Sequence, residues 1–160
     1  MEHEHYLTTL ENAMKLSWNK PALCNFHGEV FTNADIAKNV VKFGLMFEKV
    51  GLKRGDKVAI CAKNSARWGV SFLAINAYGA VVVPILADFL PDSINHLVDH
   101  SESVILFTDK EIWEKLDPAK MPMVKGVINN DDYSVLYCPD ESHRSAFENM
   151  EEDFNNKFTS

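Results

Sequence analysis

The sequence predicts an α/β domain with a largely parallel sheet and helices on both faces, preceded by an N-terminal helix and a β-hairpin. Short apolar strands alternate with helical segments from Lys57 to Ile128. Because parallel neighbours need a crossover of about a dozen residues or more, this alternation indicates βαβ units. The run Val81–Val83 is apolar without interruption, which is typical of a strand that is covered on both faces.

Two elements are expected ahead of the alternating region. Apolar residues recur at helical spacing within Leu7–Ser17, which predicts a short helix. His27 and Gly28 then separate two strand-like segments, Ala22–Phe26 and Glu29–Thr32. This arrangement indicates a hairpin with a two-residue turn.

A long amphipathic helix is expected after the hairpin. Thr32, with Asp35 three residues later, has the form of a capping box that begins a helix. Gly51 stands where a left-handed residue commonly ends one. The apolar residues between these two signals follow a helical stripe that faces the core. They are Ile36, Val40, Phe43, Phe47 and Val50.

The alternating region supplies the sheet and its covering helices. The strands are expected at Lys57–Cys61, Ala80–Ile85, Val104–Phe107 and Val124–Ile128. The helices are expected at Ser65–Tyr78, from Pro91 onward with Ile94, Leu97 and Val98 facing inward, and near Asp109–Leu116. Proline suits the first turn of a helix because its missing N–H would have no partner there.

The chain changes character after Ile128, so we divide it into an α/β subdomain at 1–128 and a loop with an acidic amphipathic segment at 129–160. Asn129–Asp132 reads as a turn and Tyr133–Tyr137 as an edge strand. Ser142–Phe158 predicts one acidic helix that needs a surface to pack on. Its apolar residues are Phe147, Met150, Phe154 and Phe158.

Composition restricts the class of protein. The chain has 160 residues, 46% of them hydrophobic and 24% charged, as in an ordinary globular domain. Its formal net charge of −7 argues against a nucleic-acid partner. It shows neither a signal peptide nor an apolar run of the roughly 20 residues that span a bilayer. The three cysteines follow no motif, and Cys61 ends an apolar strand as a buried thiol would. We expect a cytoplasmic protein.

Two short motifs have structural interpretations that we prefer. Arg54-Gly55-Asp56 matches an adhesion tripeptide, but glycine and aspartate between a helix and a strand are typical of a turn. His96 and His100 stand one helical turn apart, as in zinc proteases, but no third ligand follows in a recognisable arrangement. We expect an exposed helix face there, a frayed terminus at Glu2–His5, and no metal site.

Catalytic signatures are missing from the sequence. No segment matches the glycine-rich loops that bind nucleotide phosphates, G-x-x-x-x-G-K-[ST] and G-x-G-x-x-G. The serines lack the surroundings of a nucleophile elbow. Taken alone, these observations describe an α/β domain without a visible active site.

A set of ordered segments carries more information together than any one of them does. The segments are Phe31–Thr32, Gly51–Ile60, Asn64–Ser65, Gly79–Pro84 and Leu106–Asp109. In this order they resemble the opening of the AMP-binding (adenylate-forming) enzymes, and the resemblance extends over about Leu7 to Ile128. The resemblance is greatest to the long-chain fatty acyl-CoA synthetases. Asp131–Tyr137 and the acidic helix resemble the segment that leads to the nucleotide loop in those enzymes.

The resemblance implies a parent enzyme that uses ATP, Mg²⁺ and CoA to convert a fatty acid into acyl-CoA, AMP and pyrophosphate. In the family, a Ser/Thr/Gly-rich loop holds the phosphates, later motifs bind nucleotide and magnesium, and a C-terminal lid carries a catalytic lysine. This sequence contains none of them. We therefore expect a truncated N-terminal portion that is inactive alone, with no catalytic residue and no cofactor of its own.

One ligand contact is implied by the resemblance. In the acetyl-CoA synthetase relatives, the loop after the strand that matches Gly79–Pro84 touches the adenine of CoA. Here that loop is Leu86, Ala87 and Asp88, where the relatives have an aromatic residue and two glycines. These three residues are the candidate CoA-proximal site. A purely structural loop is the alternative, although ligands of open α/β sheets bind at such strand ends.

Other functions stay open at this point. The chain could belong to an amino-acid or aryl-acid adenylating enzyme, because the residues of the acyl pocket come later in the family. It could also be a stand-alone α/β module that binds a partner without catalysis. We expect the acidic helix either to fold back onto the domain or to leave an apolar face through which the chain self-associates.

Overall fold

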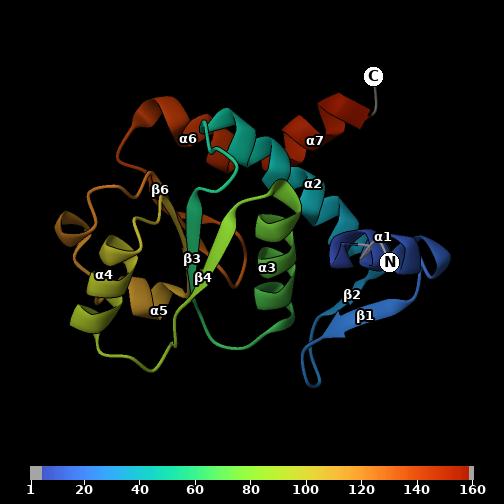
Figure 1. Cartoon of the computed structure of the whole chain (residues 1–160), viewed down its shortest axis with the longest axis horizontal. Helices are drawn as coiled ribbons and strands as arrows, with labels where there is room; N and C mark the ends of the chain where they lie inside the picture. Colours follow the sequence, from blue (N-terminus) through green and yellow to red (C-terminus); the bar gives the residue numbers. More distant parts are fainter. Residues whose placement is uncertain (1–4, 159–160) are drawn as a thin grey trace.

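The fold is described from a computed structural model, which places residues 5–158. Its centre is a five-stranded sheet in the order β4-β3-β5-β6-β7 (Figure 1). The strands are β3 Lys57–Cys61, β4 Val81–Pro84, β5 Ile105–Thr108, β6 Gly126–Asn129 and β7 Val135–Tyr137. The first four in this order run parallel, and only β7 pairs antiparallel, with β6. The predicted α/β fold with a largely parallel sheet is confirmed.

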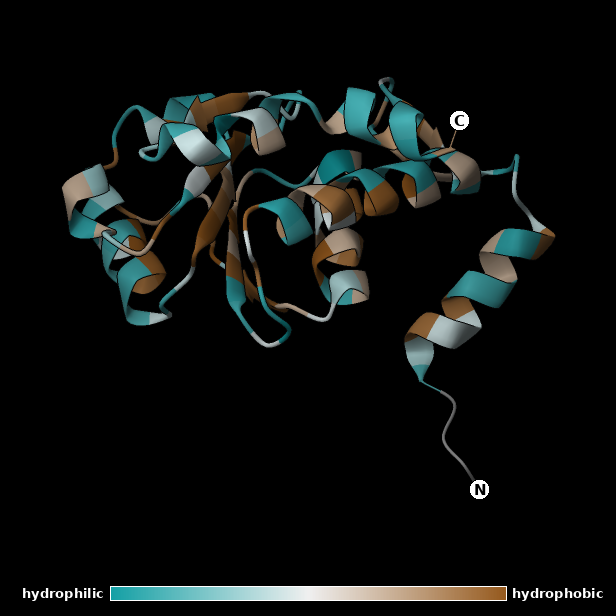
Figure 2. Ribbon diagram, turned by 90° about the horizontal axis from the view of Figure 1, so that it is seen from above, coloured by the Kyte–Doolittle hydropathy of each residue, from teal (hydrophilic) through white to brown (hydrophobic). Residues whose placement is uncertain are grey.

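Helices cover both faces of the sheet, and the strands alternate their side chains between two apolar clusters (Figures 1 and 2). On one face, Ile60 and Phe107 pack with the helices α2, α3 and α6. On the other face, Ala59 and Leu106 pack with α4 and the segment after α5. The helices are α2 Asn33–Lys49, α3 Ala66–Tyr78, α4 Pro91–His100, α5 Lys110–Trp113, the 3₁₀ turn η1 Pro118–Lys120, and α6 Glu141–Glu148.

The N-terminal helix and the hairpin both form. Helix α1, Tyr6–Leu16, buries none of its residues and stands beside α2 (Figure 1). Strands β1 Pro21–Cys24 and β2 Val30–Thr32 make a separate antiparallel sheet. The expected two-residue turn is wrong, because the strands stop short of it and the loop spans Asn25–Glu29. His27 supplies the left-handed residue of this loop, with φ 53°.

Helix α2 begins and ends as the sequence predicts. The Thr32 N–H donates to the Asp35 carboxylate at 2.9 Å, and the Asp35 N–H donates to the Thr32 hydroxyl at 3.2 Å. The Thr32 hydroxyl also donates to the Asp35 carboxylate at 2.7 Å, and this bond, together with the one from the Thr32 N–H, lowers the pKa of Asp35. Gly51 adopts φ 72°, the left-handed conformation that glycine reaches without a steric penalty. Phe43 and Phe47 are fully buried against the sheet.

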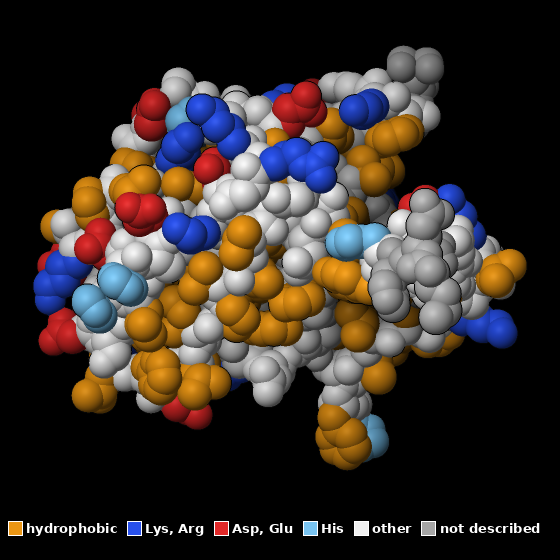
Figure 3. All heavy atoms as spheres, in the orientation of Figure 1, with side chains coloured by type: hydrophobic (Ala, Val, Ile, Leu, Met, Phe, Trp, Pro, Cys, Tyr) orange, Lys and Arg blue, Asp and Glu red, His pale blue; other side chains and the backbone are white. Residues whose placement is uncertain are grey.

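Strand β4 corrects one expectation. The sequence predicts a strand covered on both faces, but β4 lies at an edge of the sheet, and Val81 is 48% exposed. Val82 and Val83 pack only in part, one on each face. Apolar side chains gather on the side of the molecule that carries β4 (Figure 3). The uninterrupted apolar run of β4 therefore reflects a strand that is contacted on both faces. It does not indicate that the strand lies in the centre of the sheet.

The C-terminal segment packs against the rest of the chain. Strand β7 is an edge strand, as predicted, but the single predicted helix is wrong, because the chain breaks at Asn149 into α6 and α7, Met150–Phe158. Phe147 of α6 is 1% exposed and lies over Gly126 of β6. A β-carbon at Gly126 would come within 2.2 Å of that ring. The tail thus folds back onto the sheet.

Candidate functional site

The carboxyl ends of the parallel strands meet at one edge of the sheet, where open α/β sheets bind ligands. Polar residues follow β3, β5 and β6 at this edge. The Thr108 hydroxyl donates to the Cys61 carbonyl at 2.6 Å, and the Asn130 N–H donates to the Thr108 carbonyl at 2.9 Å. These bonds join the three strand ends to one another.

Asp109 is the most buried carboxyl group at the edge. It is 4% exposed and accepts a hydrogen bond from the Lys63 N–H at 2.8 Å. Burial raises its pKa, against the opposing effect of that hydrogen bond. The Lys63 ammonium turns to Glu111 at 3.3 Å. Asp109 therefore connects the loop after β3 to the end of β5, a structural task that already uses its carboxylate.

Asn130 joins the edge to helix α3. Its side chain is fully buried and accepts a hydrogen bond from the Ser71 hydroxyl at 3.0 Å. Its amide group lies 3.5 Å from the Ser65 hydroxyl, which also caps α3 by accepting from the Trp68 N–H. These buried polar groups are satisfied within the protein, so the edge is rigid.

The candidate residues Leu86, Ala87 and Asp88 lie at the same edge, directly after β4. Leu86 is 66% exposed, and its carbonyl accepts from the Phe89 N–H at 3.2 Å. Asp88 is exposed to solvent. A cavity of about 200 Å³ opens between this loop and α5. The loop is accessible to a ligand, and its contact with CoA stays a prediction.

The Cys61 thiol lies beneath this loop and 3.8 Å from the Leu86 carbonyl. The residue is fully buried, as the sequence predicts. Burial raises the pKa of the thiol to about 12, with a smaller contribution from the nearby Asp109 carboxylate. A thiol that stays protonated at neutral pH is a poor nucleophile, so Cys61 is a packing residue.

The two short motifs take the structural forms that we prefer. In the first, the Lys53 N–H donates to the Asp56 carboxylate at 2.8 Å and Gly55 adopts φ 87°, so the tripeptide is a turn. In the second, His96 and His100 stack on the exposed side of α4, with ring centroids 5.6 Å apart. Of the segment Glu2–His5, the first three residues lie outside the described part of the chain.

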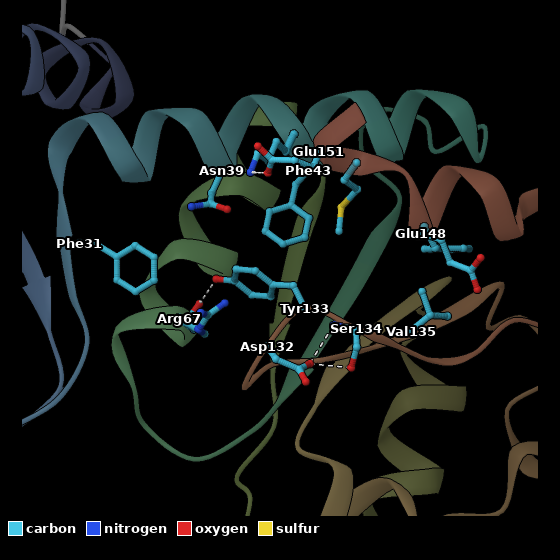
Figure 4. A pocket seen from close by; sticks show the side chains of 13 residues that line it. Phe31, Asn39, Phe43, Arg67, Asp132, Tyr133, Ser134, Val135, Glu148 and Glu151 are labelled. Atoms are coloured by element: carbon cyan, nitrogen blue, oxygen red, sulfur yellow. Dashed lines mark hydrogen bonds and ion pairs between the residues drawn. The ribbon is translucent and has the colours of Figure 1, made fainter. Parts of the chain in front are cut away.

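A second cavity, larger than the one beside Leu86–Asp88, was not predicted from the sequence. It measures about 680 Å³ and lies between α2, the start of α3, the loop before β7, and α6 with α7 (Figure 4). Aromatic and aliphatic side chains form its walls, and charged groups stand at its rim. The residues that line the cavity include Lys42, Phe43, Arg67, Tyr133, Phe147 and Glu151.

Arg67 organises one end of this cavity. Its guanidinium donates two hydrogen bonds to Glu29, at 2.8 and 2.6 Å, and lies between the rings of Phe31 and Tyr133. The Tyr133 hydroxyl donates to the Arg67 carbonyl at 3.1 Å (Figure 4). Burial raises the pKa of Tyr133 to about 12. Sequence reasoning missed this group because its members come from separate elements and share no local spacing.

The family model of the AMP-binding enzymes matches residues 10–157. The chain therefore belongs to the AMP-binding enzyme family. It is 31% identical over 101 residues to long chain acyl-CoA synthetase 4 of Arabidopsis thaliana, and 27% identical over 124 residues to 4-coumarate--CoA ligase 1 of the same plant. The two matches cover 61% and 77% of this chain.

Solved structures show the same fold. The crystal structure of the anthranilate CoA ligase AuaEII in complex with anthranoyl-AMP matches with a TM-score of 0.73 at 20% identity. The match covers 79% of this chain and 25% of that one. The chain spans 15% of the acyl-CoA synthetase and 20% of the 4-coumarate ligase named above. It is thus similar to one limited part of these much longer enzymes.

Proposed function

We propose that this chain is the N-terminal part of an ATP-dependent, AMP-forming long-chain fatty acyl-CoA synthetase that works in the cytoplasm. The observation that carries the proposal is the family match over residues 10–157 together with the similarity to long chain acyl-CoA synthetases. In the proposed reaction the fatty-acid carboxylate attacks the α-phosphorus of ATP and pyrophosphate leaves. The CoA thiol then attacks the acyl adenylate, and AMP leaves.

We infer that the magnesium and phosphate sites of that reaction lie in later parts of the enzyme. Among residues 5–158, no three His, Cys, Asp or Glu side chains gather as a metal site. The buried carboxylate of Asp109 is engaged by a backbone N–H. Phosphoryl chemistry depends on cations and N–H groups placed around the phosphates. We assign no step of the reaction to this chain and infer that it serves as a scaffold.

Within this scaffold, the proposed contact with CoA is the loop Leu86–Asp88. Its support is its place at the carboxyl edge of the sheet and the exposure of Leu86. The described helices include none long and apolar enough to cross a membrane. CoA and a fatty acid are the partners that we propose for the whole enzyme, on the strength of the family match.

An aryl-acid CoA ligase is the second candidate. The match to the 4-coumarate ligase covers 77% of the chain at 27% identity. The match to the acyl-CoA synthetase covers 61% at 31% identity. A substrate panel separates the two candidates. The protein translated from the whole reading frame is assayed for CoA thioester formation with palmitate, 4-coumarate and a set of amino acids. Preference for palmitate supports the proposal, whereas preference for 4-coumarate or an amino acid overturns the fatty-acid assignment.

A further inference from the structure

Helix α7 lies along α2 at the rim of the large cavity, and charged side chains make the contact between the two helices (Figures 1 and 4). Glu151 forms ion pairs with both Lys38, at 3.0 Å, and Lys42. Asp153, two residues after Glu151, pairs with Lys49 near the end of α2. The three lysines are spaced by four and seven residues, so they share one face of α2.

An aromatic ring adds to the same contact. The ammonium groups of Lys38 and Lys42 stand 5.3 and 5.9 Å from the centroid of the Phe154 ring, within the range of a cation–π interaction. The paired lysines lower the pKa of Glu151. Helix α7 therefore presents a carboxylate and an adjacent ring to a pair of cations.

Apolar burial holds only the start of α7. Met150 packs partly buried against the main core, whereas no residue of α7 is fully buried and Phe158 at its end is 56% exposed. Helix α6 differs, because Ala146 and Phe147 are buried in the main core. The chain breaks between the two helices at Asn149. The apolar anchor of the tail thus ends at Met150, the first residue of α7.

The folding of α7 is coupled to its docking, because most of the stability of a helix in water comes from packing against the rest of the protein and not from helix propensity. If α7 leaves α2, it loses its helical hydrogen bonds as well. Exposed ion pairs contribute only about 0.2–1 kcal/mol each and are weakened by salt. The docked and released states are therefore close in free energy.

We propose that α7 is an electrostatic latch, which covers the 680 Å³ cavity when its acids pair with the lysine face of α2 and uncovers it when those pairs are lost. Release removes Met150 and Glu151 from the cavity wall. It leaves open an apolar recess containing Phe43 and Phe147 and frees three lysines. The released state thus offers an anionic, partly apolar ligand a site that α7 itself occupies in the closed state.

The experiment is amide hydrogen exchange on the whole chain at about 0.01 M and about 1 M NaCl, where screening lengths differ by about tenfold. We expect protection of residues 150–158 to fall by about tenfold at high salt, as loss of two to three exposed pairs implies. Residues 141–148 should keep their protection from hydrogen exchange at high salt, because apolar burial anchors α6. Equal salt responses in both helices, or none in α7, would overturn the proposal.

A charge exchange tests the specific pairs. Lys42→Glu should release α7 at low salt. The double variant Lys42→Glu with Glu151→Lys should restore part of its protection, because the exchanged pair forms again while the new lysine also faces Lys38. The matched control is Lys15→Glu, which breaks the exposed pair with Glu11 on α1 and should leave α7 unchanged. Failure of the double variant to recover protection, with α6 still protected, overturns the latch. The latch is also overturned if the protection of α7 from hydrogen exchange depends on protein concentration, because α7 would then dock on a second copy of the chain.

Discussion

Gly126→Ala should destabilise the protein strongly, although it adds only one methyl group. The added carbon would lie 2.2, 2.6 and 2.7 Å from three ring atoms of Phe147, and all three distances are below any ordinary contact. The ring is 1% exposed, so it has no open space into which it can withdraw. Either β6 and α6 separate slightly or the ring leaves its place in the core.

The expected loss in the free energy of unfolding can be bounded from these two outcomes, separation of β6 from α6 and displacement of the Phe147 ring. Overpacking a core costs about 1–3 kcal/mol. Complete loss of a buried phenylalanine costs about 3–5 kcal/mol, which limits the penalty from above. Replacing a strand glycine by alanine returns about 0.5–1 kcal/mol of backbone entropy. We expect a net loss of about 1–4 kcal/mol in the free energy of unfolding, a considerable part of the ~5–15 kcal/mol typical of a domain.

Urea unfolding followed by circular dichroism measures this loss, and a double-mutant cycle assigns its cause. In a Phe147→Ala background, Gly126→Ala should cost less than about 0.5 kcal/mol, because the obstructing ring is gone. Equal penalties in both backgrounds would show that the methyl group clashes with something other than Phe147. A single variant within about 0.5 kcal/mol of the parent would show that α6 does not pack on β6 as described.

Three further predictions concern other parts of the chain. Gly44→Ala in α2 should raise the free energy of unfolding by about 0.5–1 kcal/mol in the same urea assay, since no atom lies within 4 Å of the added carbon. Iodoacetamide at neutral pH should modify the exposed Cys24 and spare Cys61, as read by mass spectrometry of the native protein, because Cys61 is buried and its thiol pKa is raised to about 12. Glu151 has a lowered pKa, so its stabilising effect is present above the ordinary value of 4.5 and is lost as pH falls through the lowered value. NMR signals of α7 should therefore shift to unfolded positions on acidification below that value, and in Lys42→Glu they should already do so at neutral pH.

Local signals predicted most of the elements. The capping box at Thr32 and the left-handed glycine at Gly51 mark the limits of α2, and each depends only on residues close in sequence. The strand β3 has the predicted bounds, because an apolar run between a turn and a helix cap leaves little choice. The order of the strands in the sheet was harder to predict from local signals, because the position of β4 at the edge depends on pairing between distant segments.

The break at Asn149 and the cavity were not accessible from sequence spacing. Phe147, Met150 and Phe154 are spaced as in one helix, but Phe147 enters the core while Phe154 meets two lysines of α2. Tertiary contacts of this kind override helical periodicity. Arg67 and Glu29 likewise come together only when the hairpin packs beside α3. Resemblance to a family, and not local pattern, was what indicated the function.

We propose that this chain is the N-terminal part of an adenylate-forming enzyme and carries none of the enzyme's chemistry. This proposal is tested by ATP–pyrophosphate exchange with magnesium and palmitate, run in parallel on this chain and on the protein translated from the whole reading frame. We expect exchange by the longer protein and none above background by this chain. Exchange catalysed by this chain alone would contradict the scaffold role, and a longer protein inactive with every carboxylic acid tried would contradict the proposed activity.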